Sequence, residues 1–245
     1  MDRQPIIPAK SDFSMKHYKH ILFDLDHTLW DFERNSSETI HQLYKSYQLE
    51  KYNLFSEPEF LKKFKEINSR LWNLYDLNEI DKEYLREERF RLVLGELGLK
   101  NDKVADKLSR DYLTICPAKE HVIPHAYEVL AYLKDRYQLH IITNGFVDIQ
   151  DKKLHHSKLR DYFKNIITSE GAGHKKPNRG IFDYALDILG ASNKDCIMVG
   201  DNIETDIRGA INFNIDIIFF NPDRISHEEK VTYEITSLME LKEIL

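Results

Sequence analysis

The feature that most constrains the fold is a series of short apolar runs, each of which stops at polar or charged residues. They are rich in β-branched or aromatic residues and lie at Tyr18–Leu25, Leu139–Ile142, Asn165–Thr168, Cys196–Val199 and Ile215–Phe220. Runs of this length and composition predict buried strands. Apolar residues recur at helical spacing in the intervening stretches 125–136, 178–189 and 204–212. Because strands alternate with helices, the sequence predicts an α/β fold with a parallel sheet.

Two of the predicted helices carry recognisable end signals. Gly190 follows the last apolar residue of the stretch 178–189, and glycine is favoured just past a helix C-terminus. Ser237 and Glu240 have the spacing of a capping box, which predicts the start of a final helix.

One long stretch interrupts the alternation. From about Asn35 to about Leu113 no convincing strand pattern is present, and apolar residues recur at helical spacing, as in Phe60, Phe64, Ile67 and Leu71. The sequence therefore predicts a separate helical module inserted after the first strand.

Composition narrows the class of protein. Hydrophobic residues make up 42% of the 245 residues, which is enough for a packed core. The net charge is −6 and no long basic run is present, which argues against a nucleic-acid polymer as partner. No apolar run approaches the roughly 20 residues needed to cross a membrane.

The N-terminal residues and the two cysteines bear on the compartment in which the protein resides. Residues 1–14 contain no continuous apolar segment, so we expect no signal peptide, and residues 1–15 are expected to form a flexible leader. Met15 is an alternative start. Cys116 and Cys196 are far apart and lack metal-type spacing, which is typical of reduced thiols in a cytoplasmic protein. The oligomeric state is not readable from the sequence.

The first predicted strand ends in two carboxylates, Asp24 and Asp26, separated by one residue. Such residues point to opposite sides of an extended chain, so they share one site only if the backbone turns there. A turn would let them converge on a cation, and Mg²⁺ prefers hard oxygen ligands. The alternative is a turn with solvated acids.

A second acidic cluster follows another predicted strand. Asp201 and Asp206 come after the run that ends at Gly200, and ligands of parallel sheets bind beyond the carboxyl ends of strands. The two clusters could build one metal site, although Asp201 could instead cap a helix.

Two further segments suit phosphate. Thr143 and Asn144 follow a predicted strand where a helix begins, a natural anion site, although a helix cap is an equal alternative. Lys175 and Lys176 precede Pro177, which we expect at the first helical position. A lysine held there could neutralise a phosphoryl oxygen, although a lysine pair alone is usually solvated.

The order of these segments resembles the four motifs of the haloacid dehalogenase-like (HAD) hydrolase superfamily. They are Asp-x-Asp-x-Thr, apolar-apolar-Thr, Lys-Pro and Gly-Asp-x-x-x-x-Asp, and the resemblance runs from about residue 17 to the C-terminus. It implies a Rossmann-like parallel sheet core at 16–33 and 115–245, with the helical insertion at 34–114 as a C1 cap. The phrases Thr-Asn-Gly-Phe at 143–146, Lys-Pro-Asn at 176–178 and Ile-Phe-Asp-Tyr-Ala-Leu at 181–186 are similar to the pyrimidine 5′-nucleotidase branch.

The resemblance implies a role for each motif residue. Asp24 is the nucleophile that becomes phosphoaspartate. Asp26 is the general acid and base, and its main-chain carbonyl ligates the metal. Thr143, Asn144 and Lys176 bind the phosphoryl group. The resemblance further implies Mg²⁺ as cofactor, with the metal ligands Asp24, Asp26, Asp201 and Asp206.

Some assignments stay open at this point. We choose Lys176 over Lys175 because it directly precedes Pro177. Pro124-His125 stands where family members often have Pro-Gly. His27 could shuttle protons but is expected to pack or meet solvent. Aromatic residues could stack on a nucleobase or belong to the core; they are Trp30, Phe32, Trp72 and Tyr75.

The resulting hypothesis is a phosphatase for small phosphate monoesters, pyrimidine nucleoside 5′-monophosphates in particular. The alternatives are a sugar-phosphate phosphatase and a phosphoglucomutase-like phosphotransferase of the same superfamily. A dehalogenase is disfavoured, because displacing a halide needs no acid such as Asp26. A non-catalytic binding protein is the remote alternative, because all four motifs are intact.

Overall fold

The computed structural model describes residues 18–245, so the expected leader at 1–15 and the alternative start at Met15 lie outside the described residues. Contacts divide the chain into two units. The first comprises the chain up to Leu29, Ile123–Thr143 and Asp161–Leu245, and the second comprises Trp30–Val122 and Asn144–Arg160.

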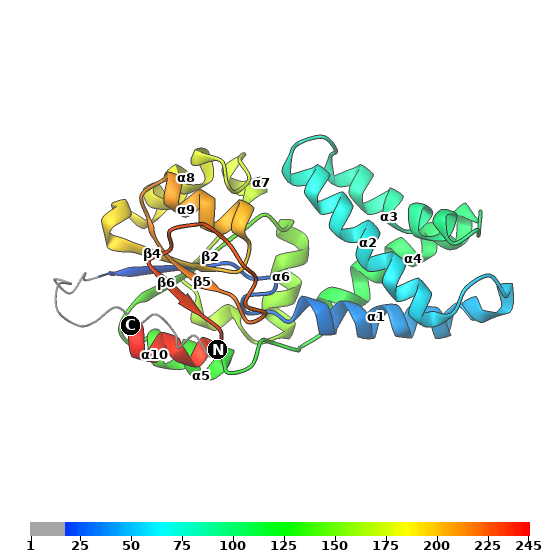
Figure 1. Cartoon of the computed structure of the whole chain (residues 1–245), viewed down its shortest axis with the longest axis horizontal. Helices are drawn as coiled ribbons and strands as arrows, with labels where there is room; N and C mark the ends of the chain where they lie inside the picture. Colours follow the sequence, from blue (N-terminus) through cyan, green and yellow to red (C-terminus); the bar gives the residue numbers. More distant parts are fainter. Residues whose placement is uncertain (1–17) are drawn as a thin grey trace. The chain divides into compact units, whose positions relative to one another are not determined.

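The first unit is built on a six-stranded sheet in which every pair is parallel (Figure 1). The strands lie in the order β3-β2-β1-β4-β5-β6. Their bounds are β1 His20–Phe23, β2 Gln138–Thr143, β3 Asn165–Thr168, β4 Cys196–Gly200, β5 Asp216–Phe220 and β6 Tyr233–Ile235. This confirms the prediction of an α/β protein with a parallel, Rossmann-like sheet. Since β1 pairs with both β2 and β4, the carboxyl ends of these three strands are neighbours.

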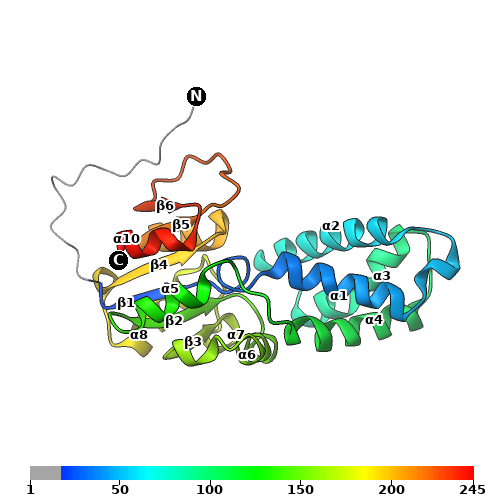
Figure 2. The same ribbon diagram turned by 90° about the horizontal axis from the view of Figure 1, so that it is seen from below.

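Helices cover both faces of this sheet. The bounds are α5 Ala126–Leu133, α7 Ser169–Ala172, α8 Arg179–Leu189, α9 Arg208–Asn212 and α10 Leu241–Ile244. Figures 1 and 2 show α8 and α9 on one face, with α5 and α10 on the other. All residues of β1 and β4 are buried, as expected of strands covered on both sides. Phe182 and Ala185 of α8 pack against Leu22 and Met198 of the sheet.

Both predicted helix-end signals are present in the structure. Gly190 caps α8 in the left-handed conformation, with φ of 60°, and Ser237 forms a capping box with Glu240, so both predictions are confirmed. The placement of Pro177 at the first helical position is wrong. Helix α8 begins at Arg179 because the side chain of Asn178 accepts a hydrogen bond from Gly180 N and caps the helix. Pro177 precedes that cap and is joined to Lys176 by a cis peptide bond.

Other segments differ from the predicted elements. Strand β1 is shorter than the run 18–25, and β6 was not predicted. The predicted helix 204–212 consists of a π-helical turn, η5 (Ile203–Ile207), followed by α9. The side chain of Asn202 caps this turn by accepting hydrogen bonds from Glu204 N and Thr205 N.

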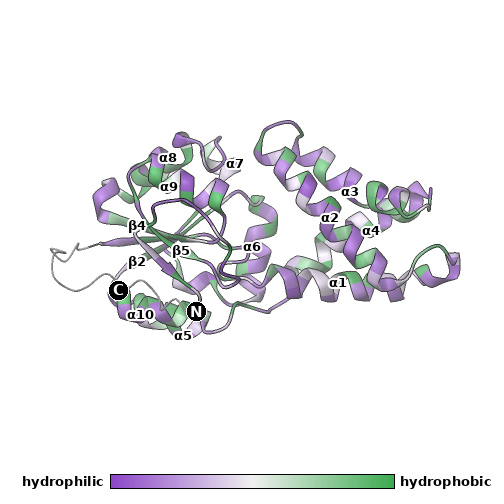
Figure 3. Cartoon of the chain, in the orientation of Figure 1, coloured by the Kyte–Doolittle hydropathy of each residue, from purple (hydrophilic) through white to green (hydrophobic). Residues whose placement is uncertain are grey.

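The second unit is helical throughout its regular structure as described. Its helices are α1 Phe32–Ser46, α2 Glu57–Asp76, α3 Lys82–Glu96, α4 Asp102–Ile115 and α6 Val147–His156. Figure 3 shows hydrophobic and hydrophilic residues side by side along α1–α4, as in amphipathic helices. The rings of Phe64, Phe90 and Tyr112 meet between α2, α3 and α4, at centroid distances of 5.1–5.7 Å. The unit also includes residues 144–160, so its bounds differ from the predicted cap at 34–114, and that cap stays a prediction.

Both cysteines, Cys116 and Cys196, are buried free thiols. Among residues 18–245, no helix combines the length and the apolar character that crossing a bilayer requires.

Candidate active site

The site forms where β1 and β4 end side by side in the first unit. Asp24 directly follows β1, and its N–H donates to the carbonyl oxygen of Val199 at 2.9 Å. Asp201 directly follows β4. The parallel register therefore brings the two acidic motifs of the sequence to one edge of the sheet.

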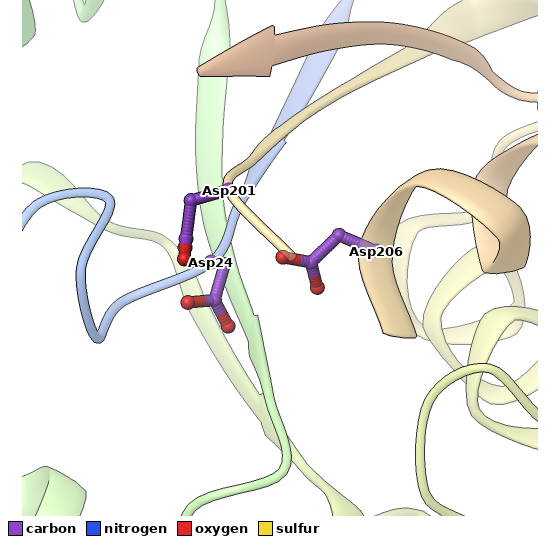
Figure 4. A group of neighbouring side chains, drawn as sticks. All are labelled: Asp24, Asp201 and Asp206. Carbon is purple, nitrogen blue, oxygen red and sulfur yellow. The ribbon is translucent and has the colours of Figure 1, made fainter. Parts of the chain in front are cut away.

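Asp206 joins Asp24 and Asp201 from the turn η5. Each of the three residues offers a carboxylate oxygen that lies within 4.8 Å of the others', and Figure 4 shows the side chains converging. Asp206 is 1% exposed, and its Oδ2 accepts a hydrogen bond from Asn202 N at 3.1 Å. Gly200 makes this approach possible, because a Cβ at that position would lie 2.5 Å from Asp206 Oδ2.

Lys176 lies between two of these carboxylates. Its Nζ donates to Asp24 Oδ1 at 2.5 Å and to Asp206 Oδ1 at 2.6 Å. The residue is 1% exposed, so a buried cation is held by charge-assisted hydrogen bonds from both sides. It is the lysine that the sequence preferred over Lys175.

A threonine completes the cluster. Thr28 is fully buried, and its Oγ1 donates to Asp201 Oδ1 at 2.7 Å. The chain turns between Asp26 and Thr28, where His27 adopts a positive φ of 64°. Sequence reasoning did not assign Thr28, Gly200 or Asn202 to the site, although Thr28 and Gly200 are part of the motifs.

The carboxylates strongly influence one another's protonation. Burial raises the pKa of Asp24 well above its ordinary value, against the attraction of Lys176, and Asp206 and Asp201 raise it further. Burial and then the charge of Asp206 raise the pKa of Asp201 to about 7. Burial tends to lower the pKa of Lys176, but Asp206 and Asp24 outweigh that effect and raise it. The cluster therefore carries more acidic groups than one lysine neutralises.

This donor set fits magnesium. Mg²⁺ prefers hard oxygen ligands and is usually held by a few carboxylates together with water and phosphate oxygens. Three converging carboxylates, of which two are almost fully buried, provide such ligands. A divalent cation would offset the repulsion that raises the pKa values of Asp24 and Asp201.

Of the remaining predicted site residues, Asp26 and Thr143 belong to the first unit and Asn144 to the second. Asp26 is half-buried in the turn after β1, and Thr143 is buried at the end of β2. Asn144 belongs to the second unit, where its Nδ2 donates to Asp76 Oδ1 at 2.9 Å. His27 is exposed, as expected. The catalytic and binding roles of Asp26, Thr143 and Asn144 stay predictions.

The four aromatic residues considered for base stacking all pack within the second unit. Trp72 stacks on Phe146 with centroids 5.3 Å apart, and Tyr75 meets both rings edge-on. Trp30 is fully buried, and Lys153 Nζ lies 4.6 Å from its ring centroid and 6.0 Å from that of Phe32. These contacts favour the packing alternative.

Comparison with known proteins agrees with this geometry. The model of the haloacid dehalogenase-like hydrolase family matches residues 18–214. The chain is 31% identical to the pyrimidine 5′-nucleotidase YjjG of Escherichia coli, covering 92% of this chain and 96% of that protein. It is 30% identical to the pyrimidine 5′-nucleotidase PynA of Streptococcus pneumoniae, covering 93% and 95%.

A solved structure is similar over almost the whole chain. The magnesium-bound HAD-hydrolase YfnB of Bacillus subtilis superposes with a TM-score of 0.84 at 29% identity, covering 94% of this chain and 99% of that one. The family match spans well over half of the sequence. The chain therefore belongs to the haloacid dehalogenase-like hydrolase family.

Proposed function

We propose that the protein is a Mg²⁺-dependent phosphatase that hydrolyses small phosphate monoesters through an aspartyl-phosphate on Asp24. The observation that carries the proposal is the convergence of Asp24, Lys176, Asp201 and Asp206 at the ends of β1 and β4. A nucleophilic carboxylate divides a difficult hydrolysis into two easier displacements. The neighbouring lysine, together with Mg²⁺ when it is bound, supplies the positive charge that an anionic nucleophile needs to approach an anionic phosphoryl group.

In the first displacement, a carboxylate oxygen of Asp24 forms a bond to phosphorus while the bond between phosphorus and the leaving oxygen breaks. Asp26 donates a proton to that leaving oxygen. In the second displacement, Asp26 takes a proton from water as the water oxygen attacks phosphorus and releases Asp24. Such acid–base assistance typically contributes about 10²–10⁴-fold.

Different groups of the chain are proposed to hold the phosphoryl oxygens and the metal. Lys176 Nζ contacts one carboxylate oxygen of Asp24, so its ammonium lies beside the group that attacks phosphorus. Thr143 at the end of β2 is proposed to donate to a phosphoryl oxygen. Asp24, Asp201, Asp206 and the Asp26 carbonyl would hold Mg²⁺, which when bound neutralises charge on the phosphoryl group.

For the substrate we propose nucleoside 5′-monophosphates, with pyrimidine bases preferred. The support is the similarity to two proteins named pyrimidine 5′-nucleotidases, at about 30% identity over almost their whole length. Base stacking on Trp72 gives this proposal little support, because Phe146 covers one face of the Trp72 ring.

The test is a panel of phosphate monoesters with purified protein and Mg²⁺, together with a chelator control. Activity should require the metal, and kcat/KM should be higher for UMP or dTMP than for glucose 6-phosphate. A ratio below one would reject the nucleotide preference and leave the phosphatase proposal standing. Full turnover in metal-free buffer would reject the metal dependence.

Two variants test the mechanism. Asp24→Asn should abolish turnover while the fold is retained, because the change is nearly isosteric and Lys176 keeps Asp206 as partner.

Asp26→Asn should slow the hydrolysis of an alkyl phosphate more than that of 4-nitrophenyl phosphate, whose leaving group needs less protonation. Asp223→Asn, at an exposed position, is the matched control for both. An equal loss for the two substrates would contradict the acid role of Asp26.

A further inference from the structure

Arg89 of α3 is a buried arginine for which the described chain provides no counter-ion. Its side chain is 4% exposed, and no hydrogen bond or ion pair links its guanidinium to another residue in 18–245. The groups close enough to affect its charge are Tyr112, Cys116 and Arg86. Phenols and thiols are ordinarily neutral at pH 7, so none of the three supplies a negative charge.

The other arginines of α2 and α3 show the usual pattern. Arg70 pairs with Glu96 at 3.0 Å, Arg86 with Asp148 at 2.7 Å, and Arg91 with both Glu88 at 2.6 Å and Asp106 at 2.8 Å. All three are more exposed than Arg89. Helices α2 and α3 therefore pair their more accessible guanidinium groups and leave the buried one without a carboxylate. An unpaired buried charge is strongly destabilising, and burial indeed lowers the pKa of Arg89.

Part of this cost is offset within the chain. The guanidinium carbon lies 5.1 Å from the ring centroid of Tyr112, a cation–π contact. That contact uses a face of the guanidinium and satisfies no N–H donor, and Arg89 Nε is a buried nitrogen without a hydrogen-bond partner.

Further buried polar atoms without partners lie on the helices that surround Arg89. They are Asn68 Oδ1 on α2, Arg86 Nε on α3 and Ser109 Oγ on α4. Helix α3 packs against both α2 and α4. Asn68 and Ser109 are 7% and 8% exposed. Internal water could satisfy a hydroxyl or an amide oxygen, but water does not neutralise a guanidinium.

We propose that Arg89 anchors an oxyanion-binding site within the helical unit, and that the site takes a carboxylate or a phosphoryl group. A guanidinium binds such groups through two parallel N–H donors, and the free Nε of Arg89 is one of the donors that a side-on pair requires. Ser109 Oγ can donate a further hydrogen bond. The anion is one that is free in solution, and the probes for it are inorganic phosphate and acetate.

A titration followed by NMR tests the site without measuring activity. The guanidinium Nε–H resonances of the ¹⁵N-labelled full-length protein are recorded while inorganic phosphate or acetate is added, in metal-free buffer. The Arg89 resonance is the one missing in Arg89→Met or Arg89→Lys. We expect a saturable shift of this resonance, and an unchanged titration of it in Arg91→Met, which removes a partly exposed, ion-paired guanidinium from the same helix. No saturable shift with either anion would overturn the proposal.

Discussion

Gly200 occupies a position where any side chain would collide with Asp206. A Cβ there would lie 2.5 Å from Asp206 Oδ2 and 2.7 Å from its Cβ, and Asp206 is held by Lys176 and by Asn202 N. We therefore expect Gly200→Ala to displace Asp206, to weaken Mg²⁺ binding and to cost about 1–3 kcal/mol of stability, as overpacked sites do. Urea unfolding and a Mg²⁺ titration measure the two effects.

Gly95→Ala is the matched control. Nothing lies within 4 Å of a Cβ at Gly95 in α3, so this substitution should leave Mg²⁺ binding unchanged and alter stability by less than about 1 kcal/mol, in the stabilising direction. Equal behaviour of the two alanine variants would show that the site tolerates a Cβ at Gly200.

A buried histidine network in the sheet predicts a pH dependence of stability. His140 is fully buried, and one ring nitrogen lies 3.1 Å from His20 Nδ1 while the other lies 3.0 Å from Asn165 Nδ2. Burial, and then the proximity of His20, lower the pKa of His140 from 6.5 to about 4. The amide of Asn165 is a donor, so the nitrogen it faces is an acceptor and the ring is neutral.

The sign follows from proton binding. Between pH 6.5 and about 4 the unfolded chain binds a proton at residue 140 that the folded chain does not, so the folded state is stabilised above 6.5 and loses that stability as the pH falls towards 4. The full contribution is on the order of 3 kcal/mol. In His140→Gln the loss of stability between pH 7.5 and 4.5, measured by urea unfolding, should be smaller than in the wild type by a substantial part of that amount. An identical loss in both proteins would show that His140 titrates normally.

At the scale of elements, helix α8 depends on the cap that directly follows the lysine motif. Asn178 Oδ1 accepts a hydrogen bond from Gly180 N at 2.8 Å. Asn178→Ala should therefore destabilise the protein by about 1 kcal/mol, the usual value of an N-cap, whereas Asn178→Asp should retain stability. Thermal unfolding of the pair gives the comparison. If alanine and aspartate behave alike, the side chain of Asn178 does not cap the helix.

The predictability of each element followed its burial. Strands β1 and β4 were found because they are buried on both faces and therefore read as continuous apolar runs. Strand β6 has three residues, of which only Ile235 is buried, so no periodic pattern marks it. The π-helical turn η5 was read as ordinary helix because apolar spacing over five residues does not separate the two. Pro177 was misplaced because proline suits the first helical position as well as the residue before a cap.

In the site, the sequence predicts which residues follow the strand ends, but it does not predict their individual hydrogen-bond partners. Asp24, Asp201 and Asp206 were predicted to meet because parallel strands carry their carboxyl ends to one edge. The bond from Thr28 to Asp201 spans 173 residues of sequence, and no local pattern reveals such a contact. Arg89 lies in a charged stretch of α3 and resembles its exposed neighbours in the sequence, so its burial is visible only once three helices are packed.

At the scale of the whole molecule, the acidic cluster is confined to one unit. Asp24, Asp201, Asp206, Lys176 and Thr28 all belong to the first unit. A ligand that binds the native state stabilises the part of the structure that must be folded to bind it, by about 2.7 kcal/mol at a concentration 100 times its Kd. The effect of Mg²⁺ should therefore be local to the unit that supplies its ligands.

Hydrogen exchange of the full-length protein tests this expectation. Addition of Mg²⁺ should slow amide exchange in 24–28 and 200–206, because these segments carry the carboxylates and the turn that holds them. Exchange in α2–α4 of the second unit should not change. In Asp201→Asn the protection should be reduced, since the variant loses a carboxylate while its amide oxygen can still accept the hydrogen bond from Thr28. If Mg²⁺ protects α2–α4 as strongly as it protects 24–28 and 200–206, the two units unfold as one. If Asp201→Asn keeps full protection, Mg²⁺ binds elsewhere.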